Sequence, residues 1–360
     1  MSKILYVAST MGHINNFHLP YINRLREEGH FVAVMSNGEG AQYNLPFVKS
    51  IFSLKNLFSQ RKIRRIIKRE KFDCIILNTT LAAFHVRMAL PRKNRPRVLN
   101  IVHGYLFSEG DRSIKARLML LCEKLLRKKT DTIAVMNGED MKIATENNLC
   151  LGEVIMTYGM GATVPETKLD KDYIRRYTDT EGKFLMCFVG ELSERKNQRF
   201  LICAMPEIKL SVPNAALLLV GEGAEENELR ELADKIGVAD AVRFVGHKSN
   251  PCDFMRAADL YVSVSEIEGM PFNLIEALGC AVPILASNTK GHRDLIEDGE
   301  DGYLYERGCT PEFISRIKAF AIGDAAVDSD HQTEKYKKYS FDEVFPKTYS
   351  VMKEFCDGKN

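Results

Sequence analysis

Two glutamates, Glu268 and Glu276, flank a short turn in the segment SEIEGMPFNLIEALGCAVP, residues 265–283. Gly269 would let the backbone approach a ligand closely, because it carries no side chain. Pro271 suits the first position of a helix, where its missing N–H would have had no intrahelical partner. The segment therefore predicts a turn followed by a helix start, with one carboxylate on each side of it.

A helix that starts at this place could hold an anion. The N–H groups of Phe272 and Asn273 would point out of the helix N-terminus, where the helix dipole favours negative charge. Glu276 lies four residues after Phe272 on the same face, and its side chain leans toward the N-terminus. Glu268 would lie on the far side of the anion. This arrangement suits a ligand with hydroxyls at both ends and phosphate between them, as in a nucleotide-sugar.

An ordinary loop with surface glutamates is the alternative, and it would be preferred for two glutamates at an arbitrary spacing. Here the glycine, the proline, the helix start and the inner glutamate occur together and in order. The segment resembles the signature of retaining glycosyltransferases of family 4, which have the GT-B fold. The resemblance implies that Glu268 is catalytic and that the donor is bound by Gly269, Met270, Phe272, Asn273 and Glu276.

A second loop, VGELSERKN at 189–197, follows the first predicted strand of the second half. Gly190 allows the turn, and Lys196 stands where a cation can meet a diphosphate at a helix start. The related enzymes usually have an arginine directly after the glycine, and both cations hold the donor diphosphate. This chain has Glu191 at that position. We expect Lys196 to bind the diphosphate, with Arg195 beside it supplying the second charge.

Histidines follow two predicted strands of the first half. His103, before a glycine, ends the strand 98–102, and the resemblance implies that it is catalytic and contacts the donor sugar. A neutral imidazole can hydrogen-bond a sugar hydroxyl. The loop after the first strand lacks the dinucleotide fingerprint Gly-x-Gly-x-x-Gly, but Gly12 would let it line the donor site. His13 and His18 are candidates for acceptor contacts, with solvated histidines as the alternative.

Short apolar runs alternate with longer amphipathic ones along the whole chain, which is typical of parallel sheets with crossover helices. The first helix is expected at 17–28, and a connector rich in glycine and charge at 159–182 separates two such series. We predict an α/β GT-B fold with two Rossmann-like domains facing each other across a cleft. Residues 1–165 form the acceptor-side domain, 166–335 the nucleotide-sugar-binding domain, and 336–360 a helix that packs back on the first domain.

Composition narrows the class of protein. A chain of 360 residues with 45% hydrophobic residues suits two soluble domains. Its nine cysteines are scattered and never form Cys-x-x-Cys, which fits reduced core cysteines in the cytosol. The N-terminus leads directly into a strand pattern, unlike a signal peptide, and no apolar run approaches the length of a bilayer span. A cytoplasmic protein is expected.

The net charge of +2 hides an asymmetry between the two halves. Residues 1–170 hold 26 Lys/Arg against 15 Asp/Glu, whereas residues 171–360 hold 24 against 33. The excess is densest at 61–69 and recurs at 127–129. No aromatic stacking platform accompanies it, so nucleic acid is not favoured. An anionic membrane surface fits better, giving a peripheral protein on the inner face of the membrane. A solvated helix face is the alternative.

The resemblance extends over most of the chain and includes HGYLFSEG in the first half, which looks like bacterial exopolysaccharide and capsule glycosyltransferases of the EpsD type. It implies transfer of a hexose or N-acetylhexosamine, with retention, from a UDP-sugar to a lipid-linked glycan acceptor on polyprenyl diphosphate, as in capsule or O-antigen synthesis. No Asp-x-Asp stands in a metal-ligand context, so neither a metal nor a cofactor is expected. A nucleotide-sugar epimerase and a non-catalytic nucleotide-sugar-binding protein remain alternatives.

Overall fold

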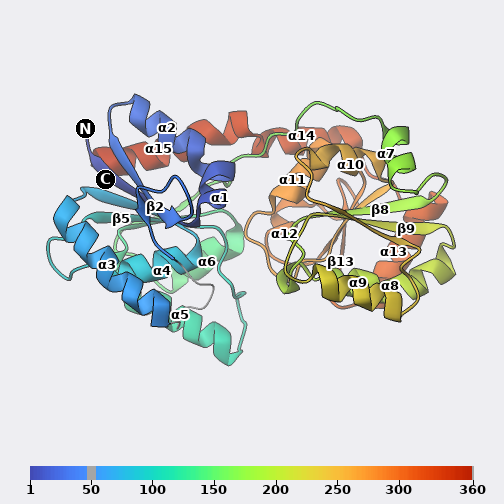
Figure 1. The fold of residues 1–360 in the computed structure, drawn as a ribbon, viewed down its shortest axis with the longest axis horizontal. Coiled ribbons are helices and arrows are strands. Elements are labelled where there is room, and N and C mark those ends of the chain that lie inside the picture. The colour runs from blue at the N-terminus through green and yellow to red at the C-terminus, as the bar shows by residue number, and fades with distance from the viewer. Residues whose placement is uncertain (47–53, 359–360) are drawn as a thin grey trace. The chain divides into compact units, whose positions relative to one another are not determined.

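The computed structural model describes residues 1–46 and 54–358. They form two compact units, each around its own sheet (Figure 1). The first unit comprises residues 1–161 and 341–360, and the second comprises residues 162–340. The chain thus leaves the first unit a few residues before the predicted boundary at 165 and returns to it with its final helix.

The first unit is built on a seven-stranded parallel sheet in the order β3-β2-β1-β4-β5-β6-β7. Its central strands are nearly continuous apolar runs such as CIILN, because a parallel sheet is covered on both faces. The strand order changes direction at β1, with β2 and β3 on one side of it and β4 to β7 on the other. This is the order of doubly wound nucleotide-binding folds. The strands are β1 (Lys3–Thr10), β2 (Phe31–Asn37), β3 (Tyr43–Asn44), β4 (Cys74–Asn78), β5 (Arg97–Val102), β6 (Thr132–Val135) and β7 (Val154–Met156).

Helices cover both faces of this sheet (Figure 1). One face packs against α3 (Leu54–Glu70), α4 (Thr80–Ala89), α5 (Ile114–Leu126) and α6 (Gly138–Glu146). The other face carries α2 (Leu19–Glu27) and α15 (Phe341–Asp357). The Tyr21 ring of α2 lies 4.7 Å from the Phe345 ring of α15, centroid to centroid. The last helix therefore completes the apolar core of the first unit.

The start of the first long helix differs from the prediction. A helix was expected at 17–28, but the helical path begins at α1 (Met11–His13) and continues through a π-helical segment, Ile14–His18, into α2. Pro20 stands near the start of α2, where the lost N–H costs little. The prediction was wrong here because no sequence signal distinguishes a π turn from an α turn.

The second unit repeats the plan with a six-stranded parallel sheet in the order β10-β9-β8-β11-β12-β13. The prediction of two Rossmann-like sheets is thereby confirmed. Its strands are β8 (Phe184–Val189), β9 (Ala215–Val220), β10 (Val242–Gly246), β11 (Leu260–Ser263), β12 (Ile284–Ser287) and β13 (Tyr303–Tyr305). Its helices are α7 (Lys171–Tyr177), α8 (Gln198–Ser211), α9 (Glu226–Lys235), α10 (Pro251–Ala257), α11 (Phe272–Gly279), α12 (His292–Leu295), α13 (Thr310–Ile322) and α14 (Ser329–Tyr339).

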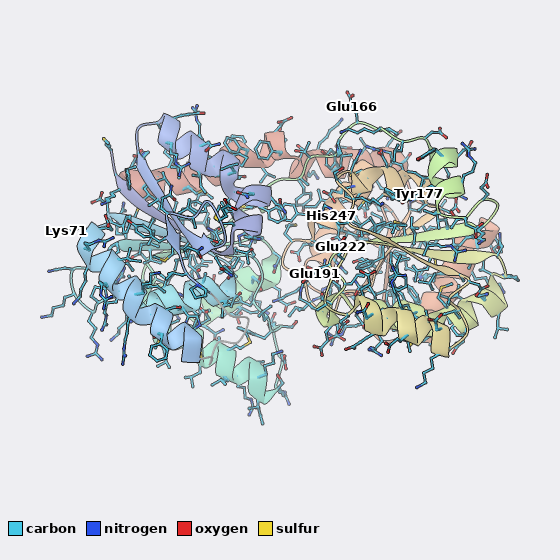
Figure 2. All side chains as sticks on the ribbon, viewed as in Figure 1. Lys71, Glu166, Tyr177, Glu191, Glu222 and His247 are labelled. Atoms are coloured by element: carbon cyan, nitrogen blue, oxygen red, sulfur yellow. The ribbon has the colours of Figure 1, made fainter. Side chains whose placement is uncertain are left out.

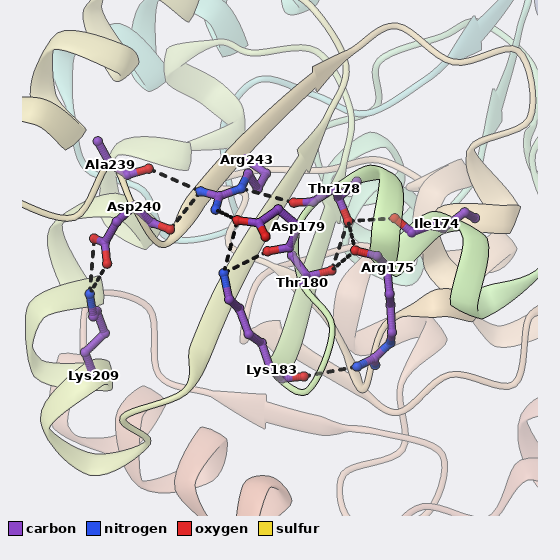
Figure 3. Close-up of polar contacts among 10 residues, drawn as sticks. All are labelled: Ile174, Arg175, Thr178, Asp179, Thr180, Lys183, Lys209, Ala239, Asp240 and Arg243. Carbon is purple, nitrogen blue, oxygen red and sulfur yellow. Dashed lines mark hydrogen bonds and ion pairs between the residues drawn. The ribbon is translucent and has the colours of Figure 1, made fainter.

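A polar network secures the amino ends of the second sheet (Figure 3). Arg243 on β10 donates to the Thr178 carbonyl at 3.0 Å and pairs with Asp179 at 2.7 Å. Arg175 on α7 donates to the carbonyl of Lys183, which directly precedes β8, at 3.0 Å. The network lies at the opposite end of the strands from the predicted donor site, so we read it as structural.

The carboxyl ends of β8, β9 and β10 are marked by Glu191, Glu222 and His247, which Figure 2 labels. The backbone there is packed closely. A Cβ added to Gly221 would lie 2.0 Å from the Gly190 carbonyl oxygen, and Gly221 has a φ of +142°. Gly221 thus allows the two loops after β8 and β9 to pack against each other.

We expect Gly221→Ala to lower the free energy of unfolding by about 2–4 kcal/mol, since it combines backbone strain with overpacking. Gly237→Ala is the matched control, because Gly237 also has a positive φ, +75°, but nothing lies within 4 Å of an added Cβ. Its cost should be about 1 kcal/mol. Urea unfolding of both variants measures the difference; equal costs would show that the loop contact is unimportant.

In the described residues, none of the helices is both long and apolar enough to span a membrane.

Candidate active site

Glu268 lies between two cations in the second unit. Its Oε1 is 2.7 Å from the Lys196 ammonium, and its Oε2 is 2.9 Å from Arg195 Nη1. The cations come from the short 3-10 turn Glu194–Lys196 after β8, and the carboxylate comes from the turn after β11. Arg195 also donates to the Ile267 carbonyl at 3.2 Å, and its own carbonyl accepts from Glu266 N–H at 3.0 Å. Two loops about 70 residues apart are thereby joined.

The pKa of the Glu268 carboxyl group is about 2. Burial alone would raise this pKa, but the charges of Lys196 and Arg195 lower it by more. Glu268 and Lys196 are both about 8% exposed, so the ion pair is poorly screened by water. At neutral pH the site therefore holds one carboxylate shared by two cations.

The contact between Lys196 and Glu268 was not expected from the sequence, which placed Glu268 on the far side of a bound anion. That placement relative to an anion stays a prediction. A buried lysine needs a counter-ion, and the carboxylate is the available one. Arg195 and Lys196 both contact the same carboxylate, so they lie together as expected from the sequence. Whether either cation binds a diphosphate stays a prediction.

The helix start after this turn also differs from the expectation. Pro271 is the N-cap residue, with extended backbone (φ −77°, ψ 106°), and not the first helical residue. Its carbonyl accepts from Leu274 and Ile275 at 3.1 and 3.2 Å. The side chain of Asn273 donates to the Val189 carbonyl at 2.7 Å, next to Gly190. This bond fixes the N-terminus of α11 against the loop that carries Lys196.

Glu276 lies one turn into α11 and is partly buried. Burial raises the pKa of its carboxyl group to about 7, and the nearby charge of Lys196 offsets part of the rise. A carboxyl with this pKa exchanges its proton near neutral pH. It can donate a hydrogen bond when protonated and accept ligand hydroxyls when ionised.

Glu276 should make stability fall as pH rises. Because its folded pKa of about 7 exceeds the unfolded value of 4.5, the folded chain retains a proton that the unfolded chain releases between these values. We expect the free energy of unfolding to fall by about 2 kcal/mol from pH 5 to pH 8 through this group. Glu276→Gln should remove that slope, and Glu231→Gln, an exposed position on α9, should leave it. Denaturant unfolding at several pH values measures it; an unchanged slope in Glu276→Gln would contradict the assignment.

His292 was not predicted to belong to the site, yet its buried ring supports the Glu268 turn. Its Nδ1 lies 2.8 Å from the Ser287 carbonyl, so Nδ1 carries the proton and Nε2 accepts from Ser263 Oγ at 3.1 Å. Burial lowers the pKa of His292 to about 4, although Glu268 works against the shift. The adjacent Gly291 has a φ of +79°, and a Cβ there would lie 2.8 Å from the Gly269 carbonyl oxygen.

The remaining predicted residues belong to the first unit. His103 follows β5, and its Nε2 lies 3.3 Å from Asn78 Oδ1 on β4. Burial, and to a smaller extent His13, lowers the pKa of His103 to about 3, so the ring is neutral. Gly12 lies in α1 and is exposed, and a Cβ added there would meet nothing within 4 Å. A methyl side chain at position 12 would therefore meet no steric clash in this structure.

Each unit thus has a Rossmann-like parallel sheet, and in the second unit a charged turn and a helix start meet beyond the strand ends. These are the features of a nucleotide-binding α/β fold. The family described as "Glycosyl transferases group 1" matches residues 170–339, and "Glycosyltransferase Family 4" matches residues 21–143. The chain belongs to the family 4 glycosyltransferases of GT-B fold, which confirms the family expected from its motifs.

Individual relatives support this assignment. The chain is 30% identical over 329 residues to a Bacillus subtilis protein named as a glycosyltransferase, EpsD, covering 88% of this chain and 86% of that one. It is 22% identical to the Escherichia coli UDP-Gal:alpha-D-GlcNAc-diphosphoundecaprenol alpha-1,3-galactosyltransferase over 81% of this chain and 77% of that one. The crystal structure of Anabaena HepE with UDP and glucose has the same fold, with a TM-score of 0.75 at 19% identity, covering 98% of this chain and 100% of that one.

Proposed function

We propose that this glycosyltransferase moves a hexose or N-acetylhexosamine, with retention, from a UDP-sugar to a glycan acceptor on polyprenyl diphosphate in polysaccharide synthesis. The observation that carries the proposal is the cluster of Lys196, Arg195 and Glu268 at the start of α11. The names of the Escherichia coli relative and of the Anabaena structure support the lipid-linked acceptor and the UDP-containing donor, respectively.

In this proposal the donor diphosphate takes the place of Glu268 as the partner of the two cations. A diphosphate carries more charge than one carboxylate, so it competes well for Lys196 and Arg195. The N-terminus of α11 adds its dipole, with Gly190, Gly269 and Met270 shaping the turns around it. Transfer then needs no metal ion, because protein groups supply the positive charge.

The same groups would act on the transition state. Negative charge grows on the leaving UDP phosphate as the glycosidic bond breaks, and cations placed there stabilise it more than they stabilise the ground state. Glu268, released from the cations, orients sugar hydroxyls and stabilises oxocarbenium character; it is not a nucleophile. Retention follows from attack on the face that the leaving phosphate vacates, with that phosphate taking the acceptor proton. His103 offers a neutral ring to a sugar hydroxyl.

The test is incubation of the full chain with a panel of UDP-sugars and a short glycan on polyprenyl diphosphate, with products identified by mass spectrometry. New glycan together with UDP supports the transferase. An isomerised donor without acceptor would instead indicate an epimerase, and binding without turnover would indicate a non-catalytic protein. The panel also identifies the sugar, because discrimination depends on a few hydrogen bonds to one hydroxyl.

We further propose that the first unit binds an anionic membrane surface, where such an acceptor resides. The basic face of α3 is exposed, as expected from the sequence. The helix α5 adds a feature that was not expected from the sequence, namely a stripe of exposed apolar side chains at positions 114, 118, 121 and 125. Exposed basic residues accompany it, including Lys124 and Arg127. An apolar stripe with basic neighbours is typical of a helix that lies in a membrane interface.

Co-sedimentation with vesicles tests the membrane proposal. Leu121→Ser with Leu125→Ser should weaken binding to vesicles that contain an anionic phospholipid, because both side chains are more than half exposed and can enter the lipid. Leu210→Ser is the control, since Leu210 is 84% exposed but lies in the second unit. Equal binding of all variants would contradict the role of α5.

A further inference from the structure

Three imidazole rings in the first unit surround one point. The ring centroids of His13 and His18 are 4.8 Å apart, and His103 lies 5.0 Å from His13 and 5.2 Å from His18. One ring nitrogen from each residue lies within 4.8 Å of the other two. Three such rings at the carboxyl ends of β1 and β5 form a cluster that the transfer chemistry does not require.

The π-helical segment Ile14–His18 brings two rings of this cluster, those of His13 and His18, together. In an α-helix, two residues five positions apart point about 140° away from each other. The wider π turn brings His13 and His18 onto one face, so that their rings meet. Such segments are rare and occur frequently at functional sites. The π-helical backbone therefore has a clear structural consequence, since it places the rings of His13 and His18 next to each other.

The hydrogen bonds around the rings indicate which ring nitrogens keep a lone pair. Asn78 Nδ2 donates to the Val7 carbonyl at 3.3 Å, so its Oδ1 accepts from His103 Nε2, and the Nδ1 of His103 keeps its lone pair. His18 Nδ1 lies 2.9 Å from the Tyr6 hydroxyl. When Nδ1 donates to that oxygen, the lone pair of His18 is on Nε2.

Two ring nitrogens of the cluster are buried and have no hydrogen-bond partner among the described residues, namely Nε2 of His13 and Nε2 of His18. The His18 side chain is fully buried. A buried polar atom without a hydrogen bond destabilises the folded state, and a bound ion would give it a partner. A neutral imidazole keeps a lone pair on the ring nitrogen that carries no proton, so His13 can also offer a ligand atom. The His13 and His103 residues are each partly exposed, although His13 Nε2 itself is buried.

We propose that His13, His18 and His103 bind one divalent transition-metal ion, with Zn²⁺ as the preferred ion. Three neutral imidazoles and one open position form a common zinc geometry, and nitrogen ligands select against Mg²⁺ and Ca²⁺. Tyr6 and Asn78 act as positioning residues, because each hydrogen-bonds the second nitrogen of a ligand histidine. This proposal revises the expectation that the chain holds no metal.

A metal at this site has a consequence that rests on the proposed function. It would occupy His103, the ring assigned to a sugar hydroxyl, so Zn²⁺ should inhibit transfer. The site itself can be tested without any sugar, and the two proposals can therefore fail separately.

The experiment titrates the metal-stripped full chain with Zn²⁺ by calorimetry and with Co²⁺ by visible absorption. We expect one ion per chain, with the intense visible bands of a four-coordinate Co²⁺ site. His13→Ala should lower the affinity by at least about 100-fold, since it removes a ligand from the ion. The matched control is His331→Ala, because His331 belongs to the exposed cluster with Glu297 and Glu300 and should not contribute.

Tyr6→Phe supplies a second variant that removes one hydroxyl and no ligand. Loss of a group that orients a metal-bound histidine should weaken Zn²⁺ binding about 10- to 100-fold. Circular dichroism verifies that each variant folds, and His103→Gln replaces His13→Ala should the latter not fold. The proposal is overturned if the chain binds neither ion, or if only His331→Ala loses binding.

Discussion

Replacing Lys196 with methionine is expected to lower kcat/KM for the sugar donor by about 10²- to 10³-fold. Methionine keeps the length and the apolar stem of the side chain but removes the charge that faces the leaving phosphate. The ammonium is nearly buried and lies 2.7 Å from Glu268, so no solvent cation can replace it. The rate of UDP release at saturating acceptor, measured over a range of donor concentrations, gives the value.

Two further variants test whether the effect depends on where the positive charge lies or only on the net charge of the unit. Lys209→Met removes a partly exposed ammonium that pairs with the exposed Asp240 in the same unit and should leave kcat/KM unchanged. Arg195→Ala should have a smaller effect than Lys196→Met, about tenfold, because its side chain is 39% exposed. Folded Lys196→Met protein with the activity of Lys209→Met would refute the role of Lys196.

The strands could be predicted from the sequence because parallel strands buried on both faces are short apolar runs. The strand Phe184–Val189 was predicted with its observed bounds for this reason. The helices near the C-terminus were harder to predict from the sequence, and α14 was not predicted. Its sequence SDHQTEKYKKY is almost wholly polar, and its fixed position depends on Gln332, whose buried amide donates to two carbonyls at 2.9 and 2.7 Å. Such an anchor exists only once the fold has formed.

The parts of the site that lie close together in the sequence could be predicted. Glycine, proline and glutamate in one turn identify the start of α11, and a lysine after β8 identifies a cation. The ion pair between Lys196 and Glu268 was not predictable, because it joins loops far apart in sequence. His292 was missed for the same reason: its two serine partners lie on β11 and β12. The π-helical turn that brings His13 and His18 together was not predicted either, because the apolar pattern of the segment indicates a helix but not its type.

Glu268→Gln is expected to change donor binding and turnover in opposite directions. The substitution keeps the size of the side chain and its hydrogen bonds to hydroxyls, but it removes the negative charge that now holds Lys196 and Arg195. Both cations are then free for phosphate, so the affinity for UDP should rise about tenfold. The transition state loses the carboxylate that stabilises positive charge on the sugar ring, so kcat should fall about 100-fold.

Calorimetry with UDP and single-turnover kinetics with the UDP-sugar measure the two effects separately. Glu266→Gln is the matched control, since Glu266 is exposed two residues away and should alter neither quantity. If Glu268 served only to hold the two loops together, its loss would weaken UDP binding and lower the free energy of unfolding in parallel. Tighter UDP binding with slower transfer can arise only if the carboxylate competes with the diphosphate for the cations and then acts on the sugar.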